Sequence, residues 1–367
     1  MKNTSRAFSP SLDSITLICT LLLVAVGLST IFSSSYSSGL EEVRPYFSRQ
    51  LVWALLGLLA MGLAIVIDYR IITSYAYQLY AISLVLLGLL LLSGTEIKGS
   101  QRWLRLMGVG IQPSEFVKLA TLFALARFLD DSGERIREVK FLAIALFLAG
   151  LPMGMILLQP DLGTGLVLLV LAGAMLFAGG IKKDHFLFLT VCGISGVPVF
   201  WHSLKGYQKA RLLSFVNPDL DPLGASYQVI QSKIAVGSGG FAGKGWLAGT
   251  QSQLNFLPEQ HTDFIFSVFA EQWGFIGSII LVFLYLLLLL QAIKIAGAAR
   301  DYQGSMLAVG ILSIISFQVL VNLLMTVGLM PVTGIPLPFM SYGGSNLLTM
   351  MTCVGILLGI RLRSFIF

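Results

Sequence analysis

The sequence predicts an all-α membrane protein with ten transmembrane helices and a large extracytoplasmic loop between the seventh and the eighth. Hydrophobic residues make up 56% of the 367 residues, charged residues make up 11%, and the mean hydropathy is +0.85. A soluble domain carries about 25% charged residues, so this chain has too few charges to cover a water-facing surface. The apolar runs are continuous and lack the alternation of a membrane β-barrel. We therefore expect residues 1–367 to form a single polytopic membrane domain.

A helix needs about 20 apolar residues to cross the hydrocarbon core of a bilayer. Ten such segments follow one another, at 14–34, 51–69, 74–94, 112–129, 139–158, 162–181, 185–203, 263–295, 305–329 and 345–362. The first has the basic flank of a signal peptide but no clear small-x-small cleavage site, so we interpret it as a retained span. The eighth is longer than a bilayer requires, which predicts tilt, a kink or projection beyond the membrane.

The basic residues indicate an orientation with both termini in the cytoplasm. Most of the short inner turns then carry cations, in agreement with the positive-inside rule. The outer side still receives five cations in short segments, where the rule disfavours them. These five are Arg44, Arg49, Lys98, Arg102 and Arg105. An anionic ligand on that face explains them, and ordinary tolerance of outer charges is the alternative.

The segment 204–262 is the only long hydrophilic stretch, and loops of such length are usually functional or disordered. Residues Tyr227, Ile230 and Ile234 share a helical face, which predicts an amphipathic helix on the membrane surface. The sequence GSGGFAGKG (237–245) lacks the Ser or Thr that completes a phosphate-binding P-loop, and no βαβ unit surrounds it. A closely packed glycine backbone is the better interpretation, and no nucleic-acid partner is indicated.

Two motifs place charge at the ends of apolar segments. In QPSEFVKL (112–119), Glu115 and Lys118 are three residues apart and can pair on one helix face. Because ionisable groups inside a membrane are costly, this pair either fixes helix packing or braces a site. In QPDLGT (159–164), Asp161 either begins the sixth helix, whose dipole favours an acid, or belongs to the same site.

Acids also gather where the eighth apolar segment begins, in NFLPEQHTDFIFSVFAEQWG (255–274). Asp263 either caps that helix or is a carboxylate at the outer face that accepts a proton. Glu271 lies about 12 Å deeper along a helix, whereas paired glycosidase carboxylates sit roughly 5–9.5 Å apart. We therefore expect one carboxylate to act alone, and we find no metal-ligand spacing among the histidines.

Two further segments are candidates for the outer face. In KGSQRWLRL (98–106), cations surround Trp103, either as an interfacial anchor or as a phosphate-binding group. In GIPLPFMSYGGS (334–345), Pro336 and Pro338 exclude a regular helix. Such backbone persists near a membrane only when it is buried in protein or lines a wet cavity, so we expect a cavity wall or a plain turn.

Together with DPLGASYQVIQSKIAVGSGGFAGKGW (221–246) and GTQSQLNFLPEQHTDFIF (249–266), these motifs resemble the SEDS family (shape, elongation, division and sporulation) along nearly the whole chain. The QSQL segment is more similar to the elongation branch than to the division branch. The resemblance implies a multi-pass glycosyltransferase of the bacterial inner membrane that polymerises lipid II beside a class B penicillin-binding protein. It implies a catalytic role for Asp263. The implied substrate-binding or site-bracing residues are Arg49, Arg102, Glu115, Lys118 and Asp161.

This chemistry agrees with the residue types. Asp263 would remove a proton from a sugar hydroxyl, while cations steady the departing polyprenyl diphosphate, so a single displacement predicts inversion. No cofactor is evident, although Mg²⁺ or Mn²⁺ could assist the diphosphate; no cage of oxygen ligands is recognisable. The alternatives are a transporter (flippase) of lipid-linked precursors, which usually shows inverted repeats, and a non-catalytic scaffold.

Overall fold

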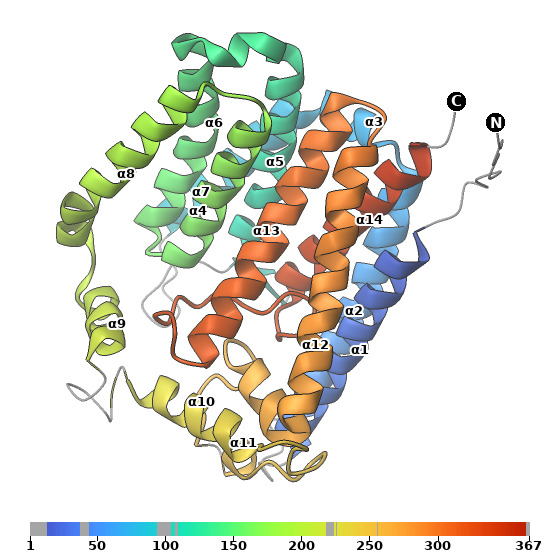
Figure 1. The fold of residues 1–367 in the computed structure, drawn as a ribbon, viewed down its shortest axis with the longest axis vertical. Coiled ribbons are helices and arrows are strands. Elements are labelled where there is room, and N and C mark those ends of the chain that lie inside the picture. The colour runs from blue at the N-terminus through green and yellow to red at the C-terminus, as the bar shows by residue number, and fades with distance from the viewer. Residues whose placement is uncertain are drawn as a thin grey trace, which may run out of the picture.

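The computed structural model describes residues 13–36, 44–93, 104–106, 109–217, 224, 226–254 and 256–364. Figure 1 shows a bundle of long helices with a cap of shorter ones at one end. The helices are α1 (Ser14–Tyr36), α2 (Arg44–Val66), α3 (Tyr69–Ser74), α4 (Ala76–Ser93), α5 (Pro113–Ser132), α6 (Val139–Leu158), α7 (Leu162–Ala178), α8 (Lys183–Ser203), α9 (Gly206–Val216), α10 (Tyr227–Ser238), α11 (Thr250–Gln253), α12 (Ile265–Ala298), α13 (Tyr302–Thr326) and α14 (Gly344–Arg363). A 3-10 helix (Gly133–Arg137) and an antiparallel pair, β1 (Leu104–Leu106) and β2 (Val109–Ile111), complete the described elements.

Each predicted apolar segment coincides with one long helix, and the all-α membrane fold is confirmed. Among the described residues, six helices are long and apolar enough to cross a membrane, and α4 and α7 contain shorter apolar stretches. The count of ten transmembrane helices therefore stays a prediction. The boundaries of two predicted segments were wrong. The segment predicted at 51–69 begins at Arg44, and the one predicted at 74–94 is preceded by the separate short helix α3. Asp68 explains the second difference, because its side chain accepts a hydrogen bond from the backbone N–H of Arg70 and so starts a new helix.

Helix α14 lies at the centre of the bundle, and nearly all of its residues between Ser345 and Ile360 are buried. Glycines bring it close to α2. A Cβ atom added to Gly344 would overlap the ring of Trp53, and one added to Gly355 would overlap the backbone of Met61. Small residues at a helix interface allow this close approach, which is the usual basis of helix packing in membranes.

Helix α12 is interrupted at Gly274, where φ is 63° and ψ is −159°. The carbonyls of Glu271 and Gln272 accept hydrogen bonds from the backbone N–H groups of Lys244 and Gly245, at 3.0 Å each. The N–H groups four residues further on, at 275 and 276, donate to the carbonyls of residues 240 and 241, at 2.9 and 3.2 Å. The four groups that an unbroken helix would pair with each other are thus paired with segment 240–245, which we call the inserted segment. The expected close packing of the glycine-rich backbone is confirmed, since a Cβ on Gly243 would overlap the Gln272 carbonyl.

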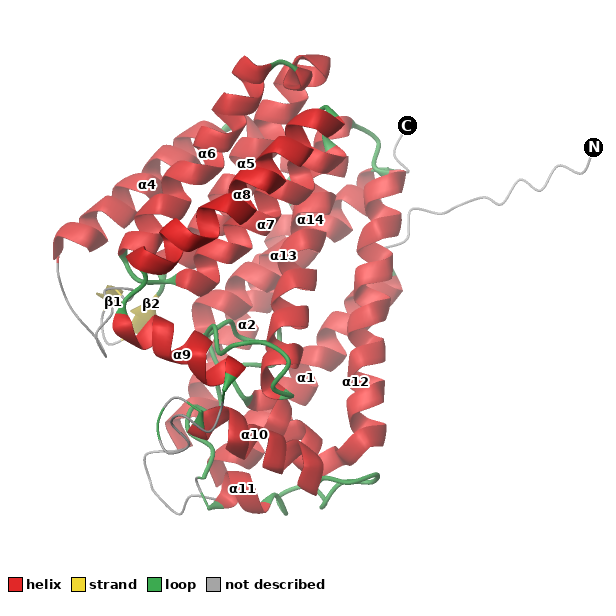
Figure 2. Ribbon diagram, turned by 60° about the vertical axis from the view of Figure 1, so that its left-hand side comes forward, coloured by secondary structure: helices red, strands yellow, loops and turns green. Residues whose placement is uncertain are grey.

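The loop that was predicted at 204–262 contains α9, α10 and α11 and lies at one end of the bundle (Figures 1 and 2). The connection between α12 and α13 lies at the opposite end. Helix α10 was predicted to use Tyr227, Ile230 and Ile234 as one face. In the structure Ser232 and Ala235 are the buried positions of this helix, and Ile234 is exposed. Small side chains permit the close approach of α10 to the first turns of α12.

Candidate functional site

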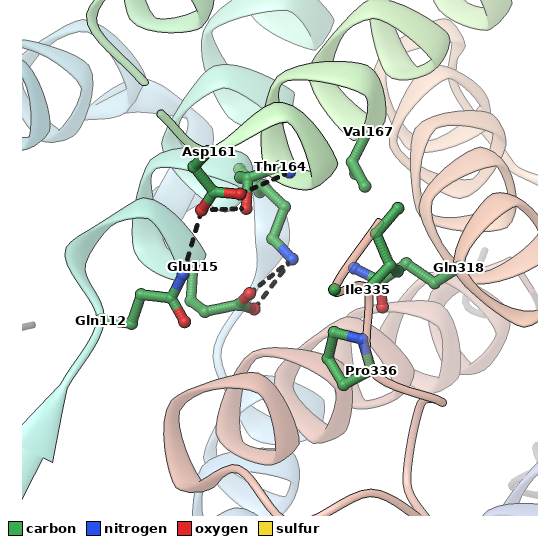
Figure 3. Close-up of a pocket in the computed structure, with 10 residues that line it drawn as sticks. Gln112, Glu115, Asp161, Thr164, Val167, Gln318, Ile335 and Pro336 are labelled. Carbon is green, nitrogen blue, oxygen red and sulfur yellow. Dashed lines mark hydrogen bonds and ion pairs between the residues drawn. The ribbon is translucent and has the colours of Figure 1, made fainter. Parts of the chain in front are cut away.

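A polar cavity of about 140 Å³ lies between the start of α5, the start of α7, α13 and the non-helical segment before α14 (Figure 3). Its lining residues are Gln112, Glu115, Lys118, Asp161, Thr164, Val167, Gln318, Gly334, Ile335 and Pro336. Three of the six candidate residues therefore meet in one place, although the sequence separates them by up to 46 positions (161 − 115). The expectation that 334–345 forms a cavity wall is confirmed for residues 334–336.

Glu115 and Lys118 form a buried ion pair in α5. The Lys118 Nζ atom lies 2.9 Å from each carboxylate oxygen of Glu115. The Asn346 side chain of α14 donates to Glu115 Oε2 at 3.1 Å. Removing two charges from water is costly, and extra hydrogen bonds of this kind are needed to offset the cost. The pair therefore ties α5 to α14 and contributes polar groups to the cavity.

Asp161 both begins helix α7 and lines the cavity, so the two alternatives for this residue hold together. As the N-cap residue of α7 it accepts hydrogen bonds from the backbone N–H and the hydroxyl of Thr164, at 3.2 and 2.9 Å. It also accepts a hydrogen bond from Gln112 Nε2 at 3.3 Å, and it lines the cavity (Figure 3). Gln318, which sequence reasoning missed, is buried opposite these groups. Its Oε1 atom has no hydrogen-bond partner in the described part of the chain.

Asp263 lies in the turn before α12, at the rim of this cavity. Phe264 is the N-cap residue of α12, so the alternative that Asp263 is the cap was wrong. The carboxylate is half-buried, and a Cβ atom added to the cavity-lining residue Gly334 would lie 3.8 Å from Asp263 Oδ2. Asp263 and the cavity are therefore separated by little more than one backbone segment.

The backbone around Asp263 is fixed by three hydrogen bonds from distant elements. Asn322 Nδ2 of α13 donates to the Asp263 carbonyl at 2.9 Å. Ser341 Oγ donates to the Thr262 carbonyl at 2.6 Å, and the Tyr342 N–H donates to the His261 carbonyl at 2.8 Å. A carboxylate on such a turn is held in place by the scaffold, which is what a reacting group requires.

Arg49 lies on α2 beside the same turn, and its side chain is exposed. It hydrogen-bonds the phenol of Tyr342, whose ring belongs to an aromatic cluster with Tyr46 and His261. The ring centroids are 4.4 Å apart for Tyr46 and His261, 4.9 Å for Tyr46 and Tyr342, and 5.7 Å for His261 and Tyr342. No local pattern indicates this cluster, because its members lie far apart along the chain.

The remaining candidate residues either lie away from the cavity or are not among the residues that the structure describes. Arg102, with Lys98 and Trp103, lies outside the described residues. The Glu271 carboxylate is fully buried against Lys244 and the start of α11, so it does not face the cavity. Within the ranges that the structure describes, no three His, Cys, Asp or Glu side chains are grouped so as to hold a metal ion.

The fold and the site define a multi-pass membrane protein with a rigidly held carboxylate at the rim of a polar cavity. A family model described as cell cycle protein, which joins FtsW, RodA and SpoVE, matches residues 13–364. The chain therefore belongs to the SEDS family, which the sequence motifs had indicated.

Relatives of known name match over nearly their full length. The peptidoglycan glycosyltransferase MrdB of Escherichia coli K12 is 40% identical over 355 residues, covering 95% of this chain and 94% of the relative. The stage V sporulation protein E of Bacillus subtilis is 39% identical over 363 residues, covering 97% and 98%.

Two solved structures share the fold. One, from work on coordinated polymerisation and crosslinking by a peptidoglycan synthase complex, has a TM-score of 0.83 at 35% identity and covers 97% of this chain and 99% of the other. The rod shape determining protein RodA of Thermus thermophilus has a TM-score of 0.72 at 32% identity, with coverage of 97% and 98%.

Proposed function

We propose that this protein is a peptidoglycan glycosyltransferase of the elongation type, which polymerises lipid II into glycan strands. The single observation that carries the proposal is the position of Asp263, half-buried on a fixed turn at the rim of a polar cavity. Tyr342, which contacts Arg49, bonds to the same turn through its backbone N–H. The names of its relatives as peptidoglycan glycosyltransferases support the reaction class. A base beside a cation is the minimum that glycosyl transfer from a diphosphate needs.

In the proposed reaction Asp263 accepts the proton of a sugar hydroxyl on lipid II. The hydroxyl oxygen attacks the anomeric carbon of the growing strand and forms the new glycosidic bond. The bond from that carbon to the diphosphate breaks, and polyprenyl diphosphate leaves with the electron pair. Attack opposite to the leaving group inverts the anomeric centre. No strong general acid is needed, because a diphosphate is already a weak base.

The cations and the cavity residues are assigned to bind the substrate. We assign the departing diphosphate to Arg49 and Arg102, because a guanidinium offers paired donors to phosphate oxygens. The Glu115–Lys118 pair braces the cavity through Asn346, and Asp161 and Gln318 offer acceptors to a polar group of the substrate. The described residues contain no group of three His, Cys, Asp or Glu side chains. Mg²⁺ usually binds to one or two carboxylates together with substrate phosphates, so assistance by Mg²⁺ or Mn²⁺ stays a prediction.

The proposal includes a location and a partner. The end of the bundle that carries α10 and α11 would face the outside of a bacterial cytoplasmic membrane, with both termini in the cytoplasm. A class B penicillin-binding protein would crosslink the strands. The similarity to a chain from a peptidoglycan synthase complex supports such a partner.

The test is to supply labelled lipid II to the purified chain in proteoliposomes, with and without a class B penicillin-binding protein. We expect glycan polymer from the wild type and none from Asp263→Asn, with an unchanged unfolding temperature. Asp131→Asn is the matched control, because that carboxylate is exposed and paired with Arg127 in the last turns of α5. Transbilayer movement of lipid II without polymer would support the transporter alternative. Neither product from the wild type would support the scaffold alternative and overturn the proposed function. Polymer from Asp263→Asn would overturn the assignment of the base.

A further inference from the structure

Tyr342 lies between the segments that carry Arg49 and Asp263, the two residues with assigned roles in the proposed reaction. Its phenol is hydrogen-bonded to Arg49, and its backbone N–H donates to the His261 carbonyl, two residues before Asp263. Its ring packs edge-on against Tyr46, which lies three residues before Arg49 on the same face of α2. The residue thus contacts both the helix that carries the cation and the turn that carries the carboxylate.

The backbone on either side of Tyr342 is fixed to α2 by one buried side chain. Gln50 Nε2 donates to the Ser341 carbonyl at 3.2 Å, and the Gly343 N–H donates to Gln50 Oε1 at 3.2 Å. This pair of hydrogen bonds brackets Tyr342. The position of the phenol relative to α2 is therefore determined by main-chain contacts and does not depend on Arg49.

We propose that Tyr342 is a positioning residue, which holds the Arg49 guanidinium toward the diphosphate of a polyprenyl-linked substrate at a fixed distance from Asp263. This inference rests on the proposed function, because the proposed function assigns binding of that diphosphate to Arg49. A guanidinium has five N–H donors, so the bond to one phenol leaves others for phosphate oxygens. An exposed arginine without such a partner would lose side-chain entropy on binding, whereas a pre-positioned one loses less.

The phenol can serve in this way at neutral pH. Burial raises the pKa of Tyr342, and this effect exceeds the opposite effect of the nearby Arg49. The hydroxyl is therefore neutral, accepts a hydrogen bond from the guanidinium, and does not neutralise its charge. The full positive charge of Arg49 remains available to an anionic ligand.

The test measures binding of farnesyl diphosphate to the full-length chain in detergent, with farnesol as the uncharged comparison. Tyr342→Phe keeps the ring against Tyr46 and His261 and removes only the hydroxyl. We expect it to weaken binding of the diphosphate about tenfold, the effect of losing one hydrogen bond to a charged group, and to leave farnesol binding unchanged. Tyr302→Phe is the matched control, because it removes a phenol that is bonded to the Gly179 carbonyl, far from the site.

A double-variant comparison separates positioning from general structural damage. In an Arg49→Ala background, Tyr342→Phe should cause no further loss, because the hydroxyl acts through the guanidinium. All values are compared at equal folded fraction, and Tyr46→Phe serves as a second variant that leaves each contact of the Tyr342 hydroxyl in place. Undiminished diphosphate binding by Tyr342→Phe, losses that add in the double variant, or an equal loss for farnesol would overturn the proposal. Diphosphate binding without polymerisation would contradict the proposed function and leave the role of Tyr342 intact.

Discussion

Replacing Glu271 by glutamine should loosen the end of α12 that packs against the inserted segment 240–245, at a residue that does not line the cavity. The Glu271 carboxylate accepts hydrogen bonds from Lys244 Nζ at 2.8 Å and from the Gln251 and Ser252 N–H groups at 2.9 and 3.3 Å. Thr250 Oγ1 adds a fourth donor at 3.2 Å. One carboxylate therefore holds both the inserted segment 240–245 and the start of α11 against α12.

The size of the effect follows from these contacts. Breaking a buried ion pair by removing one partner costs about 3–5 kcal/mol. Lys244 keeps a side-chain exposure of 26% and can turn toward water, which reduces its share. Glutamine retains one acceptor oxygen but turns its amide hydrogens toward other donors. We therefore expect a loss of about 3 kcal/mol in the free energy of unfolding, near the lower end of that range.

Two measurements check this value. Unfolding of the full chain in detergent gives the stability change, and amide hydrogen exchange reports on the Lys244 and Gly245 N–H groups, which donate to α12. Glu134→Gln is the matched control, because Glu134 is exposed in the 3-10 helix at the opposite end of the bundle. A loss below about 1 kcal/mol, or unchanged exchange in the inserted segment, would refute the reasoning.

Glu115→Gln should lower the free energy of unfolding by about 3–5 kcal/mol, because it leaves Lys118 charged and buried. Adding Lys118→Met to Glu115→Gln should restore part of that loss. Thermal unfolding of the two variants tests this, and an equal or larger loss in the double variant would contradict it. Asp301→Asn should flatten the acid side of the stability profile. Burial would raise the pKa of Asp301, but hydrogen bonds, including one from Arg70, lower it overall. Its stabilising contribution is therefore present above the unfolded-state pKa, near 3.9, and is lost as the pH falls through the lower folded pKa. Unfolding temperatures between about pH 2 and 6 test this, and parallel profiles would contradict it.

The sequence predicted the fold because a helix that crosses a bilayer needs about 20 consecutive apolar residues, and such runs are easily recognised. Each of the ten apolar segments became a helix, and the non-helical stretch at 334–336 became a cavity wall because proline and glycine exclude helix there. The predicted helix boundaries were wrong where a single polar side chain determines the end of a helix. The cap at Asp68, which begins α3, is an example that hydrophobicity alone does not reveal.

The site was predictable only where a motif keeps its members close together. Glu115 and Lys118 pair because they are three residues apart in a helix, and that spacing was visible. Three features depend on tertiary packing: the stack of Tyr46 on His261, the bond from Asn322 to the Asp263 carbonyl, and the Gln318 oxygen, which has no hydrogen-bond partner among the described residues. No local pattern encodes such contacts.

The interruption of α12 shows how a loop segment can stabilise a break in a long apolar helix close to Asp263. A broken helix in a bilayer leaves backbone groups without water, and each unpaired group costs several kcal/mol. Here the inserted segment 240–245 pairs all four groups around Gly274, so the break is stable only when that segment is in place. The part of α12 before the break is then fixed at both ends. The inserted segment fixes the end near Gly274, and Asn322 and Ser341 fix the end at the Asp263 turn. The turn that carries Asp263 therefore leads into a short helix of fixed direction, and any loosening of the inserted segment should displace Asp263 before it unfolds the bundle.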